Sequence, residues 1–451
     1  MKKKVLVIGG VAGGATFASQ LRILDDEAEI IVFEKDGTMS FANCGLPYYL
    51  GGVVKKEEQL IAATPESFSQ NKNIEVRVRH EIIKIDRPAK KIIVQDHIKN
   101  LRYEETYDQL ILSPGATPVV PEIEGLAHAR CYTLRTFEDM LRIDQQIKEN
   151  NFSSVCIVGG GFIGLEMAEN FKARGLEVFL LERSSHVMKI MDNDMGEMIE
   201  KEIVNQGVHV YTDTTIKQIE NNGRTMHLSN RATIHTDFLL LAVGVKPNTA
   251  LAEQSNLEIG ITGGIKVNSF MQTSDPDVYA VGDAIETIDF ITHAPKRVPL
   301  AWVTHREAYI AARHITEQPL PFKGVLGTSI CKVFDLTVSM LGHSEQSLTE
   351  QGIPFKTITH YSRQHAGYYP GSEKLTIKVH FSEEDGKIYG VQIIGKDGVD
   401  KRMDILSTAI KAGLSVTDLQ EIEVAYAPPF SAPKDPINMI GYKAYPIVKN
   451  K

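Results

Sequence analysis

The side chain with the clearest chemical potential is the thiol of Cys44, in the segment Ser-Phe-Ala-Asn-Cys-Gly at residues 40–45. This segment follows a glycine-rich turn near the N-terminus and an apolar strand that ends at Glu34. A sulfur at this place is positioned to meet whatever group a bound dinucleotide carries. The next cysteine is Cys131, so no second thiol lies within a few residues to resolve a disulfide. The redox partner of Cys44 must therefore come from elsewhere.

A lone cysteine is usually a small buried side chain, and this alternative applies to Cys44 as well. Its polar neighbours Ser40 and Asn43, with Gly45 directly after it, favour an approachable sulfur instead. If Cys44 opens a helix, the helix dipole lowers the pKa of the thiol and favours the thiolate. We therefore expect Cys44 to be redox-active. The remaining cysteines flank or lie in apolar strands and are expected to be structural: Cys131, Cys156 and Cys331.

A glycine-rich segment further along the chain has the complete spacing of a dinucleotide-binding loop. Residues 159–164, Gly-Gly-Gly-Phe-Ile-Gly, fit G-x-G-x-x-G between an apolar strand and a helix. Gly159, Gly161 and Gly164 permit the tight turn and the close approach of backbone to pyrophosphate, which the helix N-terminus attracts. Glu182, at the end of the next strand, is placed to accept hydrogen bonds from a ribose. Its charge repels a 2′-phosphate and favours NADH, whereas Arg183 beside it would soften this preference.

The glycine-rich segment at residues 9–14, Gly-Gly-Val-Ala-Gly-Gly, is degenerate because Val11 occupies the position of the middle glycine. Gly9 and Gly14, with the acidic Glu34 about 20 residues later, nevertheless predict a second dinucleotide site. Asp283 follows a later apolar strand in a Gly-Asp pair, where flavoproteins with two dinucleotide units place a carboxylate on the ribityl chain of FAD. A plain turn residue is the alternative for Asp283. The sequence thus predicts FAD in the first unit and NADH or NADPH in the second.

Both glycine-rich segments belong to the same pattern of strand, loop, helix and strand. The first copy has apolar strands at 5–8 and 29–33, and the second has them at 154–158 and 177–181. Continuous apolar strands are typical of a buried parallel sheet. Two copies of one nucleotide-binding unit therefore predict an α/β protein with two Rossmann-like domains.

The segments outside these units have different patterns. Residues 75–111 alternate apolar and charged side chains, which predicts antiparallel strands. From Leu326 onward, strands at 376–381 and 388–394 precede a long helix at 400–412, which predicts a third, α+β domain. We therefore expect a discontinuous FAD-binding domain (1–117 and 250–325), an NAD(P)H-binding domain (118–249) and a C-terminal domain (326–451).

The composition narrows the class of protein. A chain of 451 residues is too long for one core, and its net charge of −8 argues against nucleic acid as a partner. Four cysteines without paired spacing indicate a reducing compartment, and no cysteine or histidine cluster has metal-ligand spacing. No apolar stretch is long enough to span a bilayer, so we expect a cytoplasmic protein. The acidic run at 192–194 is interpreted as a solvated helix start rather than a calcium loop.

The complete set of motifs resembles that of the pyridine nucleotide-disulfide oxidoreductases from end to end. The Ser-Phe-x-x-Cys-Gly pattern at Cys44 is similar to the single-cysteine branch: NADH oxidases, NADH peroxidases and coenzyme A-disulfide reductases. Members that reduce oxygen or peroxide carry a histidine in the first glycine loop, where this chain has Ala12. The resemblance therefore favours a coenzyme A-disulfide reductase with FAD, a pyridine nucleotide and a C-terminal dimerisation domain.

Two C-terminal segments are similar to the tyrosine segments of coenzyme A-disulfide reductases: His-Ala-Gly-Tyr-Tyr-Pro-Gly at 365–371 and Ala-Tyr-Ala-Pro-Pro at 425–429. In that family, two tyrosines of the partner subunit lie near the cysteine, which implies a homodimer with a shared active site. By motif position they are Tyr368 and Tyr426, although Tyr369 could replace Tyr368. The positions of the family's coenzyme A contacts hold Thr16, Gln20, Ser40, Asn43, Lys72, Arg306 and Lys434. Plain interface or surface residues are the alternative for each.

The resemblance implies a mechanism in which the substrate supplies the second sulfur. Cys44 rests as a mixed disulfide with coenzyme A, which NAD(P)H reduces through FAD. The freed thiolate attacks coenzyme A disulfide, and Tyr368 and Tyr426 donate a proton or orient the sulfur. Two alternatives remain open: a peroxidase or oxidase that uses a Cys44 sulfenate, and a reductase of polysulfide or another small persulfide.

Overall fold

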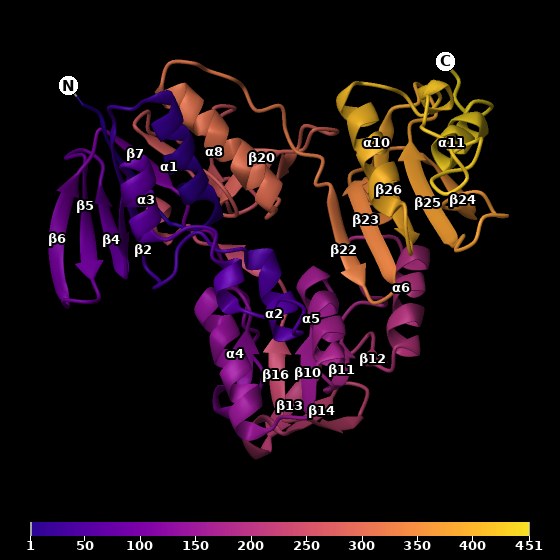
Figure 1. The fold of residues 1–451 in the computed structure, drawn as a ribbon, viewed down its shortest axis with the longest axis horizontal. Coiled ribbons are helices and arrows are strands. Elements are labelled where there is room, and N and C mark those ends of the chain that lie inside the picture. Colours follow the sequence, from indigo (N-terminus) through magenta and orange to yellow (C-terminus); the bar gives the residue numbers. More distant parts are fainter. Residues whose placement is uncertain (1, 451) are drawn as a thin grey trace. The chain divides into compact units, whose positions relative to one another are not determined.

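The computed structural model describes residues 2–450 and divides into two compact units, each of which is considered by itself (Figure 1). The first unit comprises Met1–Val120, Tyr132–Asn151 and Gly244–Val325. The second comprises Pro121–Cys131, Phe152–Val243 and Leu326–Lys451. Within residues 2–450, no helix has the length and apolar character needed to cross a membrane.

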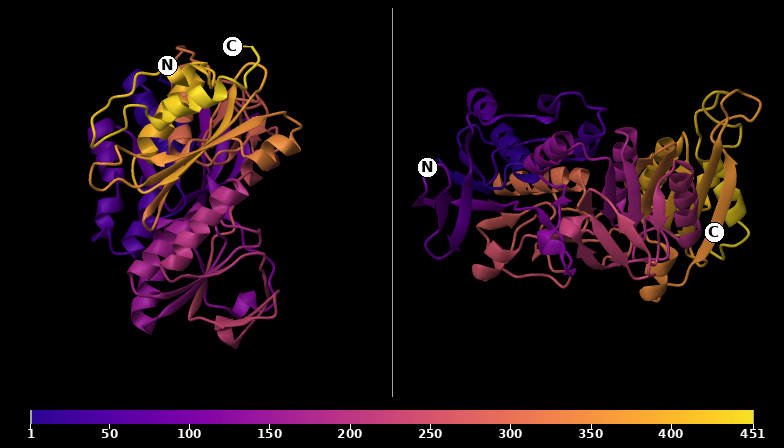
Figure 2. Two further views of the ribbon diagram at one scale, coloured as in Figure 1. Left: turned by 90° about the vertical axis from the view of Figure 1, so that its right-hand side faces the viewer. Right: turned by 90° about the horizontal axis from the view of Figure 1, so that it is seen from below.

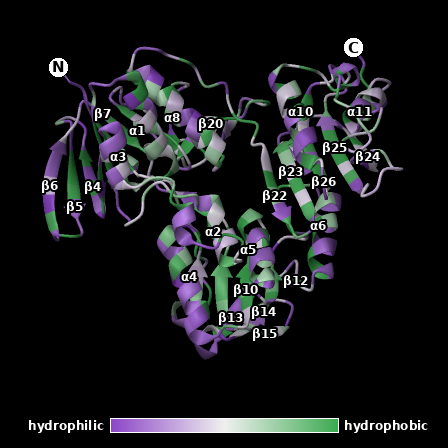
Figure 3. Cartoon of the chain, viewed as in Figure 1, coloured by the Kyte–Doolittle hydropathy of each residue, from purple (hydrophilic) through white to green (hydrophobic). Residues whose placement is uncertain are grey.

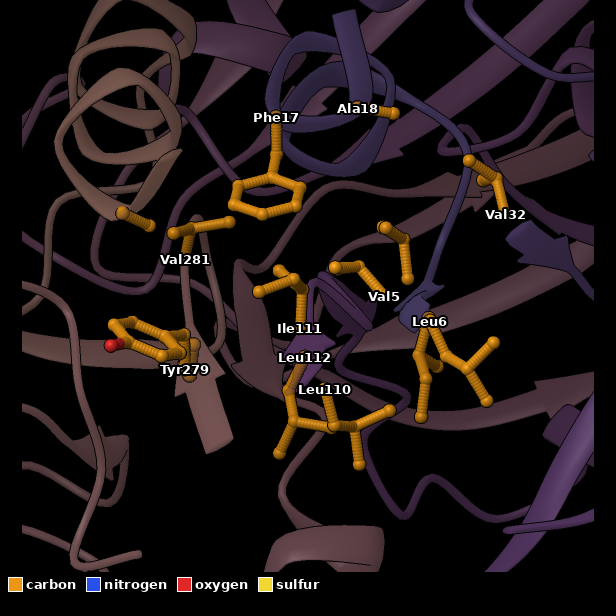
Figure 4. Packing of buried hydrophobic residues seen from close by; sticks show 14 of the residues in the cluster. Val5, Leu6, Phe17, Ala18, Val32, Leu110, Ile111, Leu112, Tyr279 and Val281 are labelled. Carbon is orange, nitrogen blue, oxygen red and sulfur yellow. The ribbon is translucent and has the colours of Figure 1, made fainter. Parts of the chain in front are cut away.

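The first unit is built on a five-stranded sheet whose neighbouring strands are all parallel. Its order is β19 (Val278–Ala280), β7 (Gln109–Leu112), β1 (Lys4–Ile8), β2 (Glu29–Glu34) and β3 (Glu75–Val78). Helices α1 (Ala12–Leu24) and α8 (Ala301–Ile315) pack against each other. Figure 4 shows the ring of Phe17 on α1 facing Ile111 and Val281, which are all buried in one core. The expected parallel βαβ unit is confirmed.

The range 75–111 is only partly antiparallel, contrary to the expectation from its alternating pattern. Its middle forms a three-stranded antiparallel sheet of β4 (His80–Asp86), β5 (Lys91–Asp96) and β6 (Leu101–Thr106). Its two ends, β3 and β7, belong to the parallel sheet instead. Since β3 is an edge strand and stays partly exposed, its alternating residues resemble an antiparallel strand.

Further helices and strands complete the first unit. The helices are α2 (Leu46–Leu50), α3 (Pro65–Lys72), α4 (Phe137–Asn150) and α7 (Ala250–Gln254). The strands are β8 (Ala116–Pro118), β17 (Val245–Pro247), β18 (Ile265–Lys266), β20 (Ile285–Ile288) and β21 (Pro295–Lys296).

The second unit repeats the parallel βαβ arrangement. Its sheet has the order β12 (His209–Tyr211), β11 (Glu177–Leu181), β10 (Ser154–Val158) and β16 (Phe238–Leu241). The order ends with β9 (Cys131–Thr133), within which the boundary between the two units falls. Helix α5 (Phe162–Ala173) follows β10, and α6 (Asn193–Asn205) follows β11. The central strands β10 and β16 are apolar along most of their length (Figure 3), as a sheet covered on both faces requires. A small antiparallel sheet contains β13 (Ile216–Glu220), β14 (Thr225–Leu228) and β15 (Thr233–His235).

The C-terminal part of the second unit is an antiparallel sheet with helices packed against it (Figure 2). The strand order is β22 (Ser329–Val333), β23 (Leu336–Gly342), β26 (Ile388–Gly395), β25 (Lys374–Phe381) and β24 (Lys356–Arg363). The helices are α9 (Glu345–Glu350), α10 (Val399–Lys411) and α11 (Pro436–Ala444). The α+β character expected after Leu326 is therefore confirmed, whereas the exact division into three domains stays a prediction.

The acidic run at 192–194 starts helix α6, as expected, but it is not solvated throughout. Asp192 is only 5% exposed, and its carboxylate accepts hydrogen bonds from Lys378 and His380, both at 2.9 Å. Burial alone would raise the pKa of Asp192, but the bonds from His380 and Lys378 hold it well below its usual range. The sequence could not reveal this burial because both partners, Lys378 and His380, lie on β25, far away in the chain.

Candidate active site

Cys44 lies in a single 3₁₀ turn, Asn43–Gly45, directly before the five-residue helix α2. Its side chain is exposed, and none of the four cysteines forms a disulfide. The segment is tied to the first glycine loop, because the Ser40 N–H donates to the Gly10 oxygen at 2.9 Å. On its other side, the Ala42 N–H donates to the Leu60 oxygen at 2.7 Å. The thiol is therefore accessible and held close in structure to the first dinucleotide loop.

The other three thiols are less reactive because Cys156 and Cys331 are buried and Cys131 is partly buried. Burial raises the pKa of Cys131 to about 11 and that of Cys331 to about 12. It raises the pKa of the fully buried Cys156 further still. Since the thiolate is the reactive form, these residues stay inert at neutral pH, as expected for structural cysteines.

The first glycine loop permits no side chain at its two key glycines. Gly9 has φ +97°, and a Cβ there would lie 2.1 Å from the Ser113 oxygen. A Cβ on Gly14 would lie 1.8 Å from the Gly9 oxygen. Helix α1 begins here without a side-chain cap, so its first N–H groups remain available to an anion.

Glu34 closes the same loop from the end of β2. Its Oε2 accepts from the Gly10 N–H at 2.7 Å, and its Oε1 accepts from the Asp36 N–H at 3.0 Å. Burial raises the pKa of this carboxyl, although the two N–H donors oppose the shift. Each oxygen keeps a lone pair that can accept from a ribose hydroxyl. The donor set and the glycine cradle fit a dinucleotide.

Asp283 lies at the same end of the sheet, and Arg135 binds it at 2.6 Å. A Cβ on Gly115 would be 3.4 Å from the Arg135 guanidinium, so the arginine passes over the turn that follows β7. Sequence reasoning missed Arg135. It precedes the N-cap Thr136 of α4 and belongs to no recognisable motif, so the only signal was its position directly before a helix.

Glu307 on α8 was also missed. It is 2% exposed, and its Oε2 accepts from the Gly282 N–H at 2.8 Å, one residue before Asp283. Burial raises the pKa of Glu307 to about 8, so it is largely protonated at neutral pH. Nothing in its helical context distinguishes it from an ordinary exposed glutamate.

The second glycine loop repeats this geometry with more open space. Gly159 has φ +112°, and a Cβ there would lie 2.4 Å from the Ala242 oxygen, while one on Gly164 would lie 1.9 Å from the Gly159 oxygen. A Cβ on Gly161, in contrast, would meet nothing within 4 Å. Glu182 accepts from the N–H groups of Gly160 at 2.7 Å and Ser184 at 2.8 Å. This loop also fits a dinucleotide, and the free space next to it lies at Gly161.

The two tyrosines predicted from the resemblance lie together in the second unit. Tyr368 and Tyr426 are 77% and 47% exposed, and the two side chains interact with each other. The interaction with Tyr368 raises the pKa of the Tyr426 hydroxyl above its ordinary value, so Tyr426 is protonated at neutral pH. The adjacent Tyr369 instead packs edge-on against His365, with ring centroids 5.6 Å apart.

Most of the residues expected to contact coenzyme A lie in the first unit. Thr16 and Gln20 are four residues apart on α1 and share a face, and the Thr16 hydroxyl is 2.6 Å from Nδ1 of His305 on α8. Lys72, at the end of α3, donates to the Ser19 hydroxyl at 2.8 Å and is thereby linked to α1. The remaining residues lie elsewhere. Ser40 and Asn43 precede Cys44, and Arg306 lies on α8 over the Tyr309 ring. Lys434 lies in the second unit near the Tyr442 ring.

Known proteins similar to this chain match it along nearly its whole length. Residues 3–302 match the family model for pyridine nucleotide-disulphide oxidoreductases, and residues 328–436 match the model for the dimerisation domain of the same family. A coenzyme A disulfide reductase of Staphylococcus haemolyticus is 40% identical over 445 residues, which cover 98% of this chain and 99% of the relative.

Two solved structures are similar along nearly the whole length. The reduced Bacillus anthracis CoADR-RHD has a TM-score of 0.98 and 45% identity, and the match covers 99% of this chain and 81% of that one. A NAD-dependent persulfide reductase from A. fulgidus has a TM-score of 0.95 and 34% identity, with 98% and 83% covered.

Proposed function

Because the chain belongs to the pyridine nucleotide-disulphide oxidoreductases, we propose that it reduces coenzyme A disulfide with NADH or NADPH, through FAD and Cys44. The observation that carries the proposal is a single exposed thiol, Cys44, tied to the first dinucleotide loop of a chain that matches a coenzyme A disulfide reductase from end to end. The other thiols are partly or fully buried, so the second sulfur of a disulfide comes from the substrate.

The two dinucleotide sites have separate tasks. Gly9, Gly14, Glu34 and Asp283 hold FAD, with Arg135 beside Asp283. Gly159, Gly161, Gly164 and Glu182 hold NADH or NADPH. When bound, FAD passes the two electrons of the nicotinamide on to sulfur.

The chemistry of the protein itself is thiol–disulfide exchange at the Cys44 Sγ. In the resting enzyme, Cys44 is bonded to the sulfur of one coenzyme A. Two-electron reduction breaks that bond and leaves the Cys44 thiolate and one coenzyme A, which takes up a proton. The thiolate then attacks coenzyme A disulfide, restores the mixed disulfide and expels a second coenzyme A thiolate. One disulfide and one NAD(P)H thus give two thiols.

Tyr368 and Tyr426 act on the leaving sulfur from the partner subunit. The match to the dimerisation-domain model supports a second copy of the chain. Tyr426 keeps its proton at neutral pH and is therefore able to donate it, or a hydrogen bond, to a thiolate. The pair is exposed in a single chain, which suits residues that complete a site across an interface.

Positive and polar side chains bind the remainder of coenzyme A. Lys72, Arg306 and Lys434 supply charge for its phosphates. Thr16, Gln20, Ser40 and Asn43 supply hydrogen-bonding groups between α1 and the Cys44 turn.

Replacement of the thiol tests the proposal. Cys44→Ser is expected to bind FAD and accept a hydride from NADH in stopped-flow absorbance, yet to lose at least about 1,000-fold in disulfide turnover, since no other nucleophilic group acts on sulfur. Undiminished reduction of coenzyme A disulfide by this variant would refute the assignment.

A persulfide reductase is the second candidate, because the A. fulgidus persulfide reductase is 34% identical over nearly the whole chain. Both activities use the same thiol. The ratio of kcat/KM for coenzyme A disulfide to that for coenzyme A persulfide separates them, and we expect the disulfide to be preferred. The oxidase and peroxidase alternatives are disfavoured by Ala12, which offers no group to act on oxygen or peroxide.

A further inference from the structure

The two exposed tyrosines stand on separate irregular segments of the second unit. Tyr368 lies in the loop 364–373, and Tyr426 lies in the segment 425–431. An exposed side chain on a loop loses conformational freedom when it adopts one reactive geometry. Something must therefore fix the bases of both segments if the hydroxyl groups are to meet reproducibly.

One buried guanidinium contacts the bases of both segments. Arg402, on α10, is 1% exposed, and its Nη2 donates to the main-chain oxygen of Gln364 at 2.8 Å. The same nitrogen donates to Oδ2 of Asp435 at 2.7 Å and lies 3.4 Å from the Ser431 hydroxyl. Gln364 begins the Tyr368 loop and Ser431 ends the Tyr426 segment.

The groups around Arg402 link the two segments to each other as well. The Ser431 hydroxyl donates to Oδ2 of Asp435, and the Ser431 oxygen accepts from the Ala366 N–H at 2.9 Å. The Gln364 side chain links the two ends of its own loop, because its Nε2 donates to the Gly371 oxygen at 3.0 Å. Asp435 in turn caps α11 by accepting from the Ile437 N–H at 3.1 Å.

The charge state of Asp435 agrees with a permanent ion pair between Arg402 and Asp435. Burial alone would raise the pKa of Asp435, but Arg402, the Ser431 hydroxyl and the Ile437 N–H hold it below its usual range. The carboxylate thus stays charged, and the ion pair stays intact, across the neutral range. A buried pair that is fully hydrogen-bonded favours one geometry over others rather than stability as such.

From this arrangement we propose that Arg402 is the positioning residue that holds Tyr368 and Tyr426 together for catalysis. The inference rests on the proposed role of the tyrosines. Arg402 does not touch the reacting sulfur; it acts through the Gln364 carbonyl and the Asp435–Ser431 pair. A lysine cannot reproduce this action, because its single ammonium lacks the planar fork that reaches a carbonyl and a carboxylate together.

The test uses Arg402→Lys in the full-length FAD-containing enzyme, with [13Cζ]tyrosine labelling. We expect the NMR titration of Tyr426 to shift to lower pH, because the interaction with Tyr368 that raises its pKa is lost when the loops relax. We also expect kcat for the disulfide to fall roughly 10- to 100-fold from lost orientation, with the KM for NADH unchanged. Ser431→Ala, which removes one hydroxyl, is the milder second variant and is expected to shift the titration in the same direction.

The matched control is Lys378→Met, which removes a cation from the other buried ion cluster of the second unit, at Asp192. It is expected to lower the thermal midpoint and to leave the Tyr426 titration as in the parent enzyme. If Arg402→Lys and Ser431→Ala both keep the parental titration and kcat, Arg402 has only a structural role and the inference is wrong. If Arg402→Lys fails to fold, the result for Ser431→Ala decides. Since the titration needs no substrate, it stands even if the disulfide assignment fails.

Discussion

The two glycine loops have the same backbone plan but offer different environments. In both, the first glycine has a positive φ, and a glutamate carboxylate bridges two N–H groups of the loop and the next turn. Glu34 is buried, whereas Glu182 is half-buried and Arg183 beside it is exposed. The first loop also has Arg135, Asp283 and the buried Glu307 close to it in structure.

The difference agrees with the ligands proposed for the two loops, a bound flavin at the first and an exchanging nucleotide at the second. A prosthetic group that stays bound suits a loop with buried carboxyl groups on several sides, as at Glu34 and Glu307. A nucleotide that enters and leaves in every cycle suits a loop with free space, as at Gly161. In the proposed enzyme, one supersecondary unit would thus serve two purposes, and Arg135, Asp283 and Glu307, which distinguish the first loop, come from outside it.

The largest expected effect comes from placing a side chain at the last glycine of each glycine-rich segment, Gly14 or Gly164. Gly14→Ala places a Cβ 1.8 Å from the Gly9 oxygen, and Gly164→Ala places one 1.9 Å from the Gly159 oxygen. Each is expected to destabilise its own βαβ unit by about 3 kcal/mol or more, since backbone must move. Gly14→Ala should lose FAD, whereas Gly164→Ala should keep it and lose NADH binding. Equal flavin loss in both, measured by absorbance per protein, would contradict separate sites.

The second expected effect is a change in how stability depends on pH, and it concerns Glu307 near the first loop. Within residues 2–450, no equivalent buried glutamate lies at the second loop. Its folded pKa, about 8, is above the ordinary value, so the native state binds more protons than the unfolded state between the two values. The stability from protonated Glu307 is therefore present at low pH and is lost as pH rises through the folded pKa. We expect Glu307→Gln to gain stability relative to the parent enzyme between about pH 5 and about pH 9, measured by denaturant unfolding. Parallel pH profiles would show that Glu307 titrates normally.

The smallest effect concerns the nucleotide preference at Glu182. Glu182→Gln removes a charge-assisted hydrogen bond to ribose, which is expected to raise the KM for NADH roughly tenfold. The KM for NADPH should rise less, because repulsion of the 2′-phosphate also disappears. Glu34→Gln serves as the control at the other loop: it is expected to change flavin retention and to leave the KM for NADH alone. An unchanged KM in Glu182→Gln would remove this residue from the nucleotide site.

The parallel βαβ units could be predicted closely from the sequence. The strands at 154–158 and 177–181 have the predicted ends, because buried parallel strands appear as continuous apolar runs between glycines. The resemblance, not the pattern, predicted that Tyr368 and Tyr426 belong together. The interaction of Tyr368 with Tyr426 fits that expectation, while their catalytic role remains a proposal.

Long-range polar partners could not be predicted. Asp192 contacts Lys378 on β25, Glu307 accepts from the Gly282 N–H, and Arg402 contacts groups from two loops. Each residue has an ordinary local context, and its burial depends on elements that are distant in the chain. The alternating residues of β3 led to the wrong expectation of an antiparallel strand, because an edge strand of a parallel sheet is also half exposed.

The most direct test of the central claim is the intact mass of the purified protein before and after dithiothreitol, followed by peptide mapping. The account predicts one reducible adduct with the mass of coenzyme A, located on Cys44. An unmodified or oxygenated Cys44 in freshly purified, unreduced enzyme would contradict a resting mixed disulfide and would favour sulfenate chemistry instead.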